Sequence, residues 1–329
     1  MTASTLLVAI SAGFVLVGLL VLVTETLESM LARGQTALVD GSKWDSDSTP
    51  INGDSEVEIE ARALLIAERA AEEAGKLLLK IFRGSRLSVW PKHDYAGSLV
   101  TNADREAERL IVSHIRRSGI KSTVISEEAG RLSFGYDSIV WAVDPLDGTL
   151  NYVKRIPYFA VSIGVLIDHK TIAGVIYNPI LDEMFTARRD EGARLNDTEI
   201  HVSTKKTLRN ASLILEWWEP EPLIPDPLDL ERRLYRFTRR LRSPGSVALN
   251  LCSVASGRFD GSVTVFQKSP IYETAAGCLI VQEARGKVTN SSGGSWEDFS
   301  GSIIAGGEQI HSKLLSLVRE LAHKQPIQL

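Results

Sequence analysis

Cysteine and histidine are scarce in this 329-residue sequence, and their scarcity limits the chemistry open to it. The two cysteines and six histidines are scattered, without the paired spacing of a zinc site. Cys252 and Cys278 each lie in an apolar helical pattern, so we expect them to pack in the core rather than form a disulfide. Oxygen-ligand metals are therefore favoured.

An excess of basic residues is also absent. The chain has 37 Lys and Arg against 41 Asp and Glu, a formal net charge of −4. This balance argues against nucleic acid as a general partner, and we predict none. An acidic protein that acts on an anionic substrate must obtain positive charge elsewhere, and bound metal is the natural source. The length and the 44% hydrophobic content allow one large domain or two fused ones.

Charged residues are missing from residues 5–23, which are mostly Leu, Val, Ala, Ile and Phe. This stretch just reaches the length of about 20 residues that spans a bilayer core, and no basic residue precedes it as in a signal peptide. We therefore predict an uncleaved, single-pass membrane anchor over residues 1–30. A cleaved signal or a true start at Met30 are the alternatives. Arg33 and Lys43 follow, which places the catalytic domain in the cytoplasm by the positive-inside rule.

The remaining chain divides into a linker and a folded domain. Residues 31–55 have the polar composition of a flexible linker, and residues 56–329 predict one domain. Helices and strands then mix without strict βαβ alternation, which favours an α+β fold over a doubly wound sheet. The apolar patterns predict helices over residues 57–82, 104–114, 246–256 and from 271 onward, and strands over 87–90, 123–125, 139–143, 160–167, 171–177, 183–187, 210–217 and 262–265.

The strongest functional signal is the segment DPLDGT at residues 144–149, directly after an apolar strand. The carboxylates of Asp144 and Asp147 are ligands that hard divalent cations prefer. Proline fixes the turn between them, so the Leu146 carbonyl can also point at a metal. The Gly-Thr amides stand at a possible helix start, where a phosphate is well received. The segment predicts metal-assisted phosphate chemistry, although an acidic surface turn with a helix cap has the same composition.

Two further acidic clusters occupy similar places. Glu127 and Glu128 follow a short apolar strand, and Glu273 opens an apolar helical segment. Singly, the glutamate pair is typical of a solvated helix start, and Glu273 could simply complement a helix dipole. Three such clusters together favour a common site.

These motifs resemble those of the inositol monophosphatase-like phosphatases, which include archaeal fructose-1,6-bisphosphatases. The resemblance runs from about Glu58 to the C-terminus. It implies stacked α/β/α/β/α layers with two large sheets, and a homodimer. The motifs are Leu99 to Asp104, Ser126 to Glu128, Trp141 to Thr149, Asn151 to Val153, Tyr177 to Pro179, Gly192-Ala193 with Asn196, Gly245-Ser246 with Ala248 to Asn250, and Glu273 with Ala275 to Gly277.

The resemblance implies two or three Mg²⁺ ions. Glu127, Asp144 and the Leu146 carbonyl would hold the first ion, and Asp144, Asp147 and Glu273 the second. A weaker third ion would use Glu127 and water. The cofactor expected from the sequence is therefore Mg²⁺.

The resemblance also implies catalytic and substrate-binding roles. Thr149, held by a hydrogen bond to Asp104, would act with Glu127 to orient and deprotonate the attacking water. Lys92 matches a family lysine near the active-site loop, and a solvated loop lysine fits the sequence equally. The residues expected to bind substrate are Asp147, Gly148, Thr149, Gly245, Ser246 and Glu273.

Three departures from the family pattern leave the substrate open. The family's C-terminal metal ligand is usually Asp, where this chain has Glu273. Seven residues earlier, Phe266 replaces a glutamate that many inositol-specific members use to bind sugar hydroxyls, and Val247 stands where a smaller residue is common. We expect a small polyol or sugar phosphate of the inositol 1-phosphate type as substrate. The alternatives are a fructose-1,6-bisphosphatase, a nucleotide 3′-phosphatase, or a membrane-tethered phosphate-binding protein without turnover.

Overall fold

The computed structural model describes residues 56–84, 87–92, 99–135, 138–217, 226–238 and 240–322, all within a compact unit that spans residues 46–329. The predicted membrane anchor (residues 1–30) and linker (residues 31–55) lie outside the described residues. Among the described helices, none has the length and apolar character of a membrane span.

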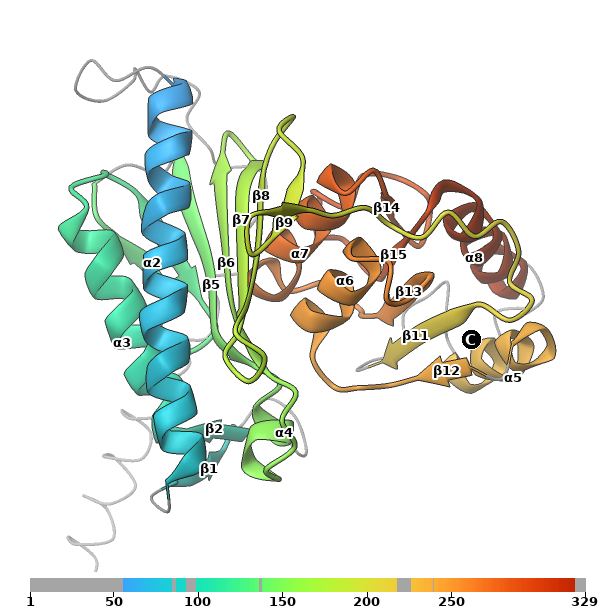
Figure 1. Ribbon diagram of the computed structural model, residues 1–329, viewed down its shortest axis with the longest axis horizontal. Helices are drawn as coiled ribbons and strands as arrows, with labels where there is room; N and C mark the ends of the chain where they lie inside the picture. Colours follow the sequence, from blue (N-terminus) through green and yellow to red (C-terminus); the bar gives the residue numbers. More distant parts are fainter. Residues whose placement is uncertain are drawn as a thin grey trace, which may run out of the picture. The chain divides into compact units, whose positions relative to one another are not determined.

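In the part of the chain that the structure describes, the framework consists of two mixed sheets and one small hairpin (Figure 1). The larger sheet contains β3 (Thr123–Ser126), β4 (Gly130–Ser133), β5 (Ile139–Asp147), β6 (Ala160–Ile167), β7 (Lys170–Asn178), β8 (Glu183–Arg188), β9 (Ala193–Leu195) and β10 (Thr198–Glu199). Its strand order is β10-β9-β8-β7-β6-β5-β3-β4, with β3 and β5 parallel and the other neighbours antiparallel.

The smaller sheet contains β11 (Ser212–Trp217), β12 (Arg240–Arg242), β13 (Gly261–Val265), β14 (Lys287–Asn290) and β15 (Ile303–Gly306). Its order is β12-β11-β13-β15-β14, with β11 parallel to both of its neighbours. The hairpin pairs β1 (Val89–Pro91) with β2 (Leu99–Thr101).

Helices cover both sheets and separate them, which confirms the α+β fold with α/β/α/β/α layers. The helices are α2 (Glu56–Arg83), α3 (Asn102–Arg117), α4 (Thr149–Val153), α5 (Pro227–Phe237), α6 (Val247–Ala255), α7 (Ile271–Glu283) and α8 (Glu308–Ala322). In Figure 1, α2 and α3 cover one face of the larger sheet, and α6 and α7 lie between the sheets. Helices α5 and α8 cover the other side of the smaller sheet.

Strand β5 lies inside the larger sheet, between β6 and β3, and all nine of its residues are buried. Helices α3 and α7 contact it, so its first five residues, Ile139 to Val143, are continuously apolar rather than alternating. The prediction of a turn between Asp144 and Asp147 is wrong, because the strand continues to Asp147. The register against β6 shifts between Asp144 and Asp147. Pro145 has no N–H to donate and is tolerated at such an irregularity.

The other predicted helices and strands are present, within a few residues at their ends. Cys252 and Cys278 are buried free thiols, as expected. The alternative of a helix start at Glu127 and Glu128 is wrong, because these residues form the turn that leads into β4. The elements that the sequence did not predict are β2, β4, β9, β10, β12, β14, β15, α5 and α8.

Close packing of α7 against the larger sheet depends on glycine. A Cβ atom at Gly174 in β7 would lie 2.8 Å from the Ala276 carbonyl oxygen in α7. Gly174→Ala is therefore expected to destabilise the fold by about 1–3 kcal/mol, because backbone would have to move. Denaturant unfolding measures this loss. Gly84→Ala is the control, because a Cβ there would make only ordinary contacts. Equal unfolding midpoints for the two variants would contradict the packing argument.

Candidate active site

The predicted site residues come from separate segments that meet at the C-terminal end of β5. Asp144 and Asp147 lie in this strand, and Thr149 begins α4 directly after it. The Glu127 amide donates to the Val143 carbonyl at 3.2 Å, which fixes the end of β3 beside β5. Glu273 lies in the first turn of α7.

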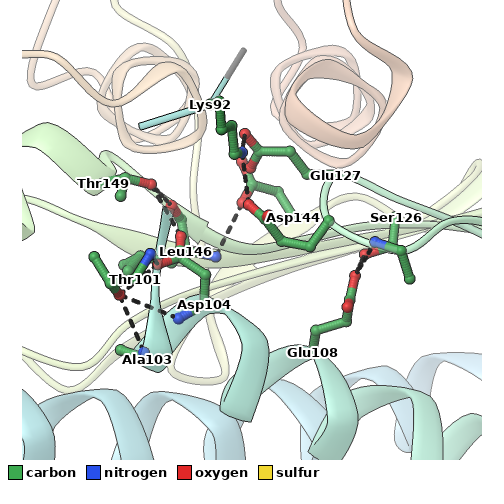
Figure 2. A network of polar contacts seen from close by, with 12 residues as sticks. Lys92, Thr101, Ala103, Asp104, Glu108, Ser126, Glu127, Asp144, Leu146 and Thr149 are labelled. Atoms are coloured by element: carbon green, nitrogen blue, oxygen red, sulfur yellow. Dashed lines mark hydrogen bonds and ion pairs between the residues drawn. The ribbon is translucent and has the colours of Figure 1, made fainter. Parts of the chain in front are cut away.

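The contact between Thr149 and Asp104, expected from the sequence, is present. The Thr149 hydroxyl lies 3.1 Å from Asp104 Oδ1 and 3.1 Å from the Leu146 carbonyl oxygen, so it can donate to either (Figure 2). The second Asp104 oxygen accepts from the amide and the hydroxyl of Thr101, in a capping box that starts α3. Burial raises the pKa of Asp104 to about 6, although the hydrogen bonds from Thr101 and Thr149 act in the opposite direction.

The residues at the start of α6 donate hydrogen bonds to Asp147. Its carboxylate accepts from the Ser246 hydroxyl, from the Val247 amide at 3.2 Å and from the Ala248 amide at 2.9 Å. Gly148 approaches the same loop, where a Cβ would lie 3.2 Å from the Gly245 carbonyl oxygen, and its φ of 92° also favours glycine. The predicted substrate-binding residues of β5 and α6 are thus brought together.

Sequence reasoning missed Glu216, a buried carboxylate at the end of β11. It accepts from the Gly245 amide at 2.6 Å, the Ser243 hydroxyl at 2.7 Å and the Asn250 side chain at 3.1 Å. Asn151 holds the other side of this loop by donating to the Pro244 carbonyl at 2.8 Å. No motif of the sequence marks Glu216, because its partners lie 27 to 34 residues away.

Burial and mutual repulsion dominate the electrostatics of the acidic side chains. Asp144 and Asp147 are 1% and 4% exposed. Burial raises the pKa of Asp144 well above its usual range, and the charges of Glu127, Asp147 and Glu273 raise it further. Burial followed by the same kind of repulsion also raises the pKa of Glu273. Without a cation, the ionised form of these carboxylates is therefore energetically unfavourable.

Lys92 is a part of this cluster rather than a solvated loop residue. Its side chain is 15% exposed, and its Nζ lies 2.6 Å from a carboxylate oxygen of Glu127 and 2.6 Å from one of Glu128 (Figure 2). Burial opposes the charged ammonium, but the two carboxylates more than compensate and raise the lysine pKa. Burial and the neighbouring Glu127 raise the pKa of Glu128 to about 7.

The chemistry of the donor set fits a hard divalent cation. Glu273 Oε2 is buried without a hydrogen-bond partner, which is costly unless another ligand satisfies it. Within the described ranges, however, no three acidic, cysteine or histidine side chains are close enough to enclose a metal ion. The repulsion between the carboxylates and the lack of a close group of three ligands are compatible. Charges repel one another over distances much longer than the roughly 2.0–2.1 Å between Mg²⁺ and its ligands. Several carboxylates instead bind protein donors such as Lys92 and Ser246.

Phe266 lies in the core between the sheets. Its side chain is 4% exposed and belongs to the apolar cluster that includes Leu279 and Trp296. Val247, the other atypical residue, is the first residue of α6 and is fully buried. Neither side chain offers a polar group for binding sugar hydroxyls.

Fold and site together define a class of layered α+β proteins with acidic side chains gathered at the C-terminal end of a buried strand, here β5. A profile of the inositol monophosphatase family matches residues 60–323. The chain belongs to the inositol monophosphatase family.

Relatives and solved structures support this assignment. "Nus factor SuhB" of Pasteurella multocida is 38% identical over 260 residues, covering 78% of this chain and 95% of that protein. The extragenic suppressor protein suhB of Bartonella henselae has a similar structure, with a TM-score of 0.72, 35% identity, and coverage of 78% and 98%. An inositol monophosphatase II of Staphylococcus aureus, solved with inositol monophosphate bound, gives a TM-score of 0.63, 26% identity, and coverage of 79% and 95%.

Proposed function

We propose that this protein is a Mg²⁺-dependent phosphomonoesterase that hydrolyses a small polyol or sugar phosphate of the inositol 1-phosphate type. The observation that carries the proposal is the group of mutually repelling carboxylates of Asp144, Asp147 and Glu273, the first two buried, together with the hydrogen-bonded pair Thr149–Asp104. Family membership supports phosphatase activity. The inositol monophosphate bound to the S. aureus relative supports the substrate class.

The cations would be held by oxygen ligands from β3, β5 and α7. These ligands are Glu127, Asp144, the Leu146 carbonyl, Asp147 and Glu273. When bound, Mg²⁺ supplies positive charge that stabilises the phosphoryl group in the transition state and makes water more acidic. The mutual repulsion among these carboxylates supports such a role.

The chain's own residues would orient the attacking water and take its proton. When Thr149 donates to Asp104, its hydroxyl oxygen keeps lone pairs that can accept a hydrogen bond from water. This arrangement needs an ionised Asp104, which a pKa of about 6 allows at neutral pH. Glu127 would accept the proton as the water oxygen attacks phosphorus and the bond to the alcohol oxygen breaks, and the departing alcohol oxygen would take a proton from solvent water. The amides of Gly148 and Thr149 would bind phosphate oxygens.

A substrate panel tests the proposal. Full-length protein is incubated with Mg²⁺ in H₂¹⁸O and with inositol 1-phosphate, fructose 1,6-bisphosphate, a 3′-phosphonucleotide or a generic phosphomonoester. We expect most rapid release from the polyol or sugar phosphates, with one ¹⁸O atom in the phosphate formed. Preference for the 3′-phosphonucleotide would favour that alternative. Release of phosphate without ¹⁸O would contradict direct attack by water on phosphorus.

A second candidate is a binding role without turnover, favoured by the name "Nus factor" that several relatives carry. No release from any member of the panel would support it. Membrane attachment and cytoplasmic location stay predictions, because the predicted anchor lies outside the described residues. Dimerisation also stays a prediction, because the structure contains a single chain.

The replacement of Asp by Glu at position 273 gives a further prediction. Glu273→Asp would withdraw the carboxylate by one methylene while close packing holds α7 in place. Because Mg²⁺ demands near-ideal octahedral geometry, we expect the Mg²⁺ concentration for half-maximal activity to rise roughly tenfold. A Mg²⁺ titration of initial rates measures this change, with exposed Glu308→Asp as the control. Unchanged metal dependence would argue against a special role for the longer side chain.

A further inference from the structure

Glu108 is a buried carboxylate that no motif of the sequence singled out. It lies on α3 with 8% of its surface exposed. One of its oxygens, Oε1, accepts from the Ser126 hydroxyl and from the Ala129 amide at 2.8 Å. Figure 2 shows the side chain reaching from the helix to the end of β3. Both donors lie outside α3, so this carboxylate joins two elements.

The two donors of Glu108 flank the residues that carry the acidic charge. Ser126 ends β3, Ala129 precedes β4, and between them lie Glu127 and Glu128. Glu108 therefore holds both ends of the turn. The 3.2 Å hydrogen bond from the Glu127 amide to β5 completes the attachment of this turn.

The same face of α3 holds a second part of the site. Asp104 lies four residues before Glu108, one helical turn away on the same side. It contacts Thr149, whereas Glu108 contacts the turn of Glu127. Four fully buried apolar residues anchor the helix itself: Ala103, Ala107, Ile111 and Ile115. Helix α3 thus fixes the relative positions of Thr149 and Glu127.

We propose that Glu108 is a positioning residue that sets the Glu127–Glu128 turn for cation binding; this inference rests on the proposed function. Burying a carboxylate costs free energy unless hydrogen-bond donors satisfy it. The donors to Glu108 are the Ser126 hydroxyl and the Ala129 amide, which lie at the two ends of this turn. The residue itself does not contact the reacting groups. Its loss should weaken cation binding and leave substrate binding by the loop around Gly245 unchanged.

The test compares Glu108→Ala and Glu108→Gln in the full chain, with Glu106→Ala as the matched control. Glu106 lies on the same helix and accepts from Asn102 of that helix. For Glu108→Ala we expect the Mg²⁺ concentration for half-maximal activity to rise roughly tenfold with KM for inositol 1-phosphate unchanged. We also expect faster amide hydrogen exchange confined to residues 127–129. Glu108→Gln should recover most of both properties, because its amide oxygen can still accept both hydrogen bonds.

Several results would overturn the proposal. One is unaltered Mg²⁺ activation and exchange in Glu108→Ala; another is an equal loss of melting temperature and rate in both Glu108 variants without a shift in metal dependence. If the wild-type chain releases no phosphate, the proposed function fails. The positioning role of Glu108 is then tested by the affinity for Mn²⁺ and by amide hydrogen exchange. Weaker Mn²⁺ binding and faster exchange at residues 127–129 in Glu108→Ala would still support it. Unchanged values, or a wild-type chain that binds no Mn²⁺, would overturn it.

Discussion

Asp144→Asn is expected to lower Mg²⁺-dependent phosphate release by roughly a thousandfold or more and, at the same time, to stabilise the metal-free fold. Activity falls because Asp144 is the carboxylate that both predicted cations share. The fold gains because the variant removes a buried carboxyl group whose ionisation is opposed by burial and by the charges of Glu127, Asp147 and Glu273. The asparagine oxygen can still accept from the Leu146 amide, so the local backbone keeps its hydrogen bond.

The two effects of Asp144→Asn are measured by phosphate release and by thermal unfolding in EDTA. Each unit by which folding raises a carboxyl pKa costs roughly 1.4 kcal/mol once the solution pH exceeds that pKa. We therefore expect the melting temperature of the metal-free variant to exceed that of the wild type at pH 8. Exposed Asp168→Asn on the hairpin between β6 and β7 is the control and should change neither property. An active variant, or one that unfolds at a lower temperature, would contradict the assigned role.

Magnesium is expected to stabilise the folded protein more strongly at pH 8.5 than at pH 6.5. Burial raises the carboxyl pKa values of Asp104 to about 6 and of Glu128 to about 7, and raises those of Asp144, Asp147 and Glu273 as well. The folded state thus holds protons that the unfolded state has released. Stability from these groups is greatest below their unfolded pKa values and is lost as the pH rises through the folded values.

The range from pH 6.5 to 8.5 lies above the pH at which His311 would change stability in the opposite direction. Burial lowers the pKa of His311 to about 4, so its contribution to stability is lost as the pH falls below about 6.5. Above that pH, each extra proton held by the folded state costs roughly 1.4 kcal/mol per pH unit.

Melting temperatures with EDTA and with saturating Mg²⁺ measure this linkage. We expect the EDTA curve to fall from pH 6.5 to 8.5 and the Mg²⁺ curve to change less. A ligand at a hundred times its Kd contributes about 2.7 kcal/mol. Parallel curves would show that the cation does not bind at the carboxylates.

The sequence indicates the layered fold mainly through strongly patterned elements. Strand β5 is recognisable because both of its faces are buried, and α3 because apolar residues recur at helical spacing. The short strands β9, β10 and β12 have two or three residues each, too few for a period to appear. Helix α8 was predictable, since Ile310, Leu314, Leu317, Val318 and Leu321 follow a helical period and are buried.

The candidate site was predictable where its residues stand in local motifs. Asp144 and Thr149 are a few residues apart, and the family resemblance assigns them roles. Glu108 and Glu216 were missed because their partners lie 18 to 34 residues away, and only the tertiary fold brings these groups together. The strand through Asp147 was missed because a proline normally ends a strand, whereas here it occupies an irregularity.

The measurement that tests the central claim most directly is the initial rate of phosphate release from inositol 1-phosphate by the full chain as a function of Mg²⁺ concentration. We predict no release in EDTA, a saturable increase with added Mg²⁺, and loss of that increase in Asp144→Asn. Release that persists in EDTA, or that Asp144→Asn leaves intact, would contradict the account.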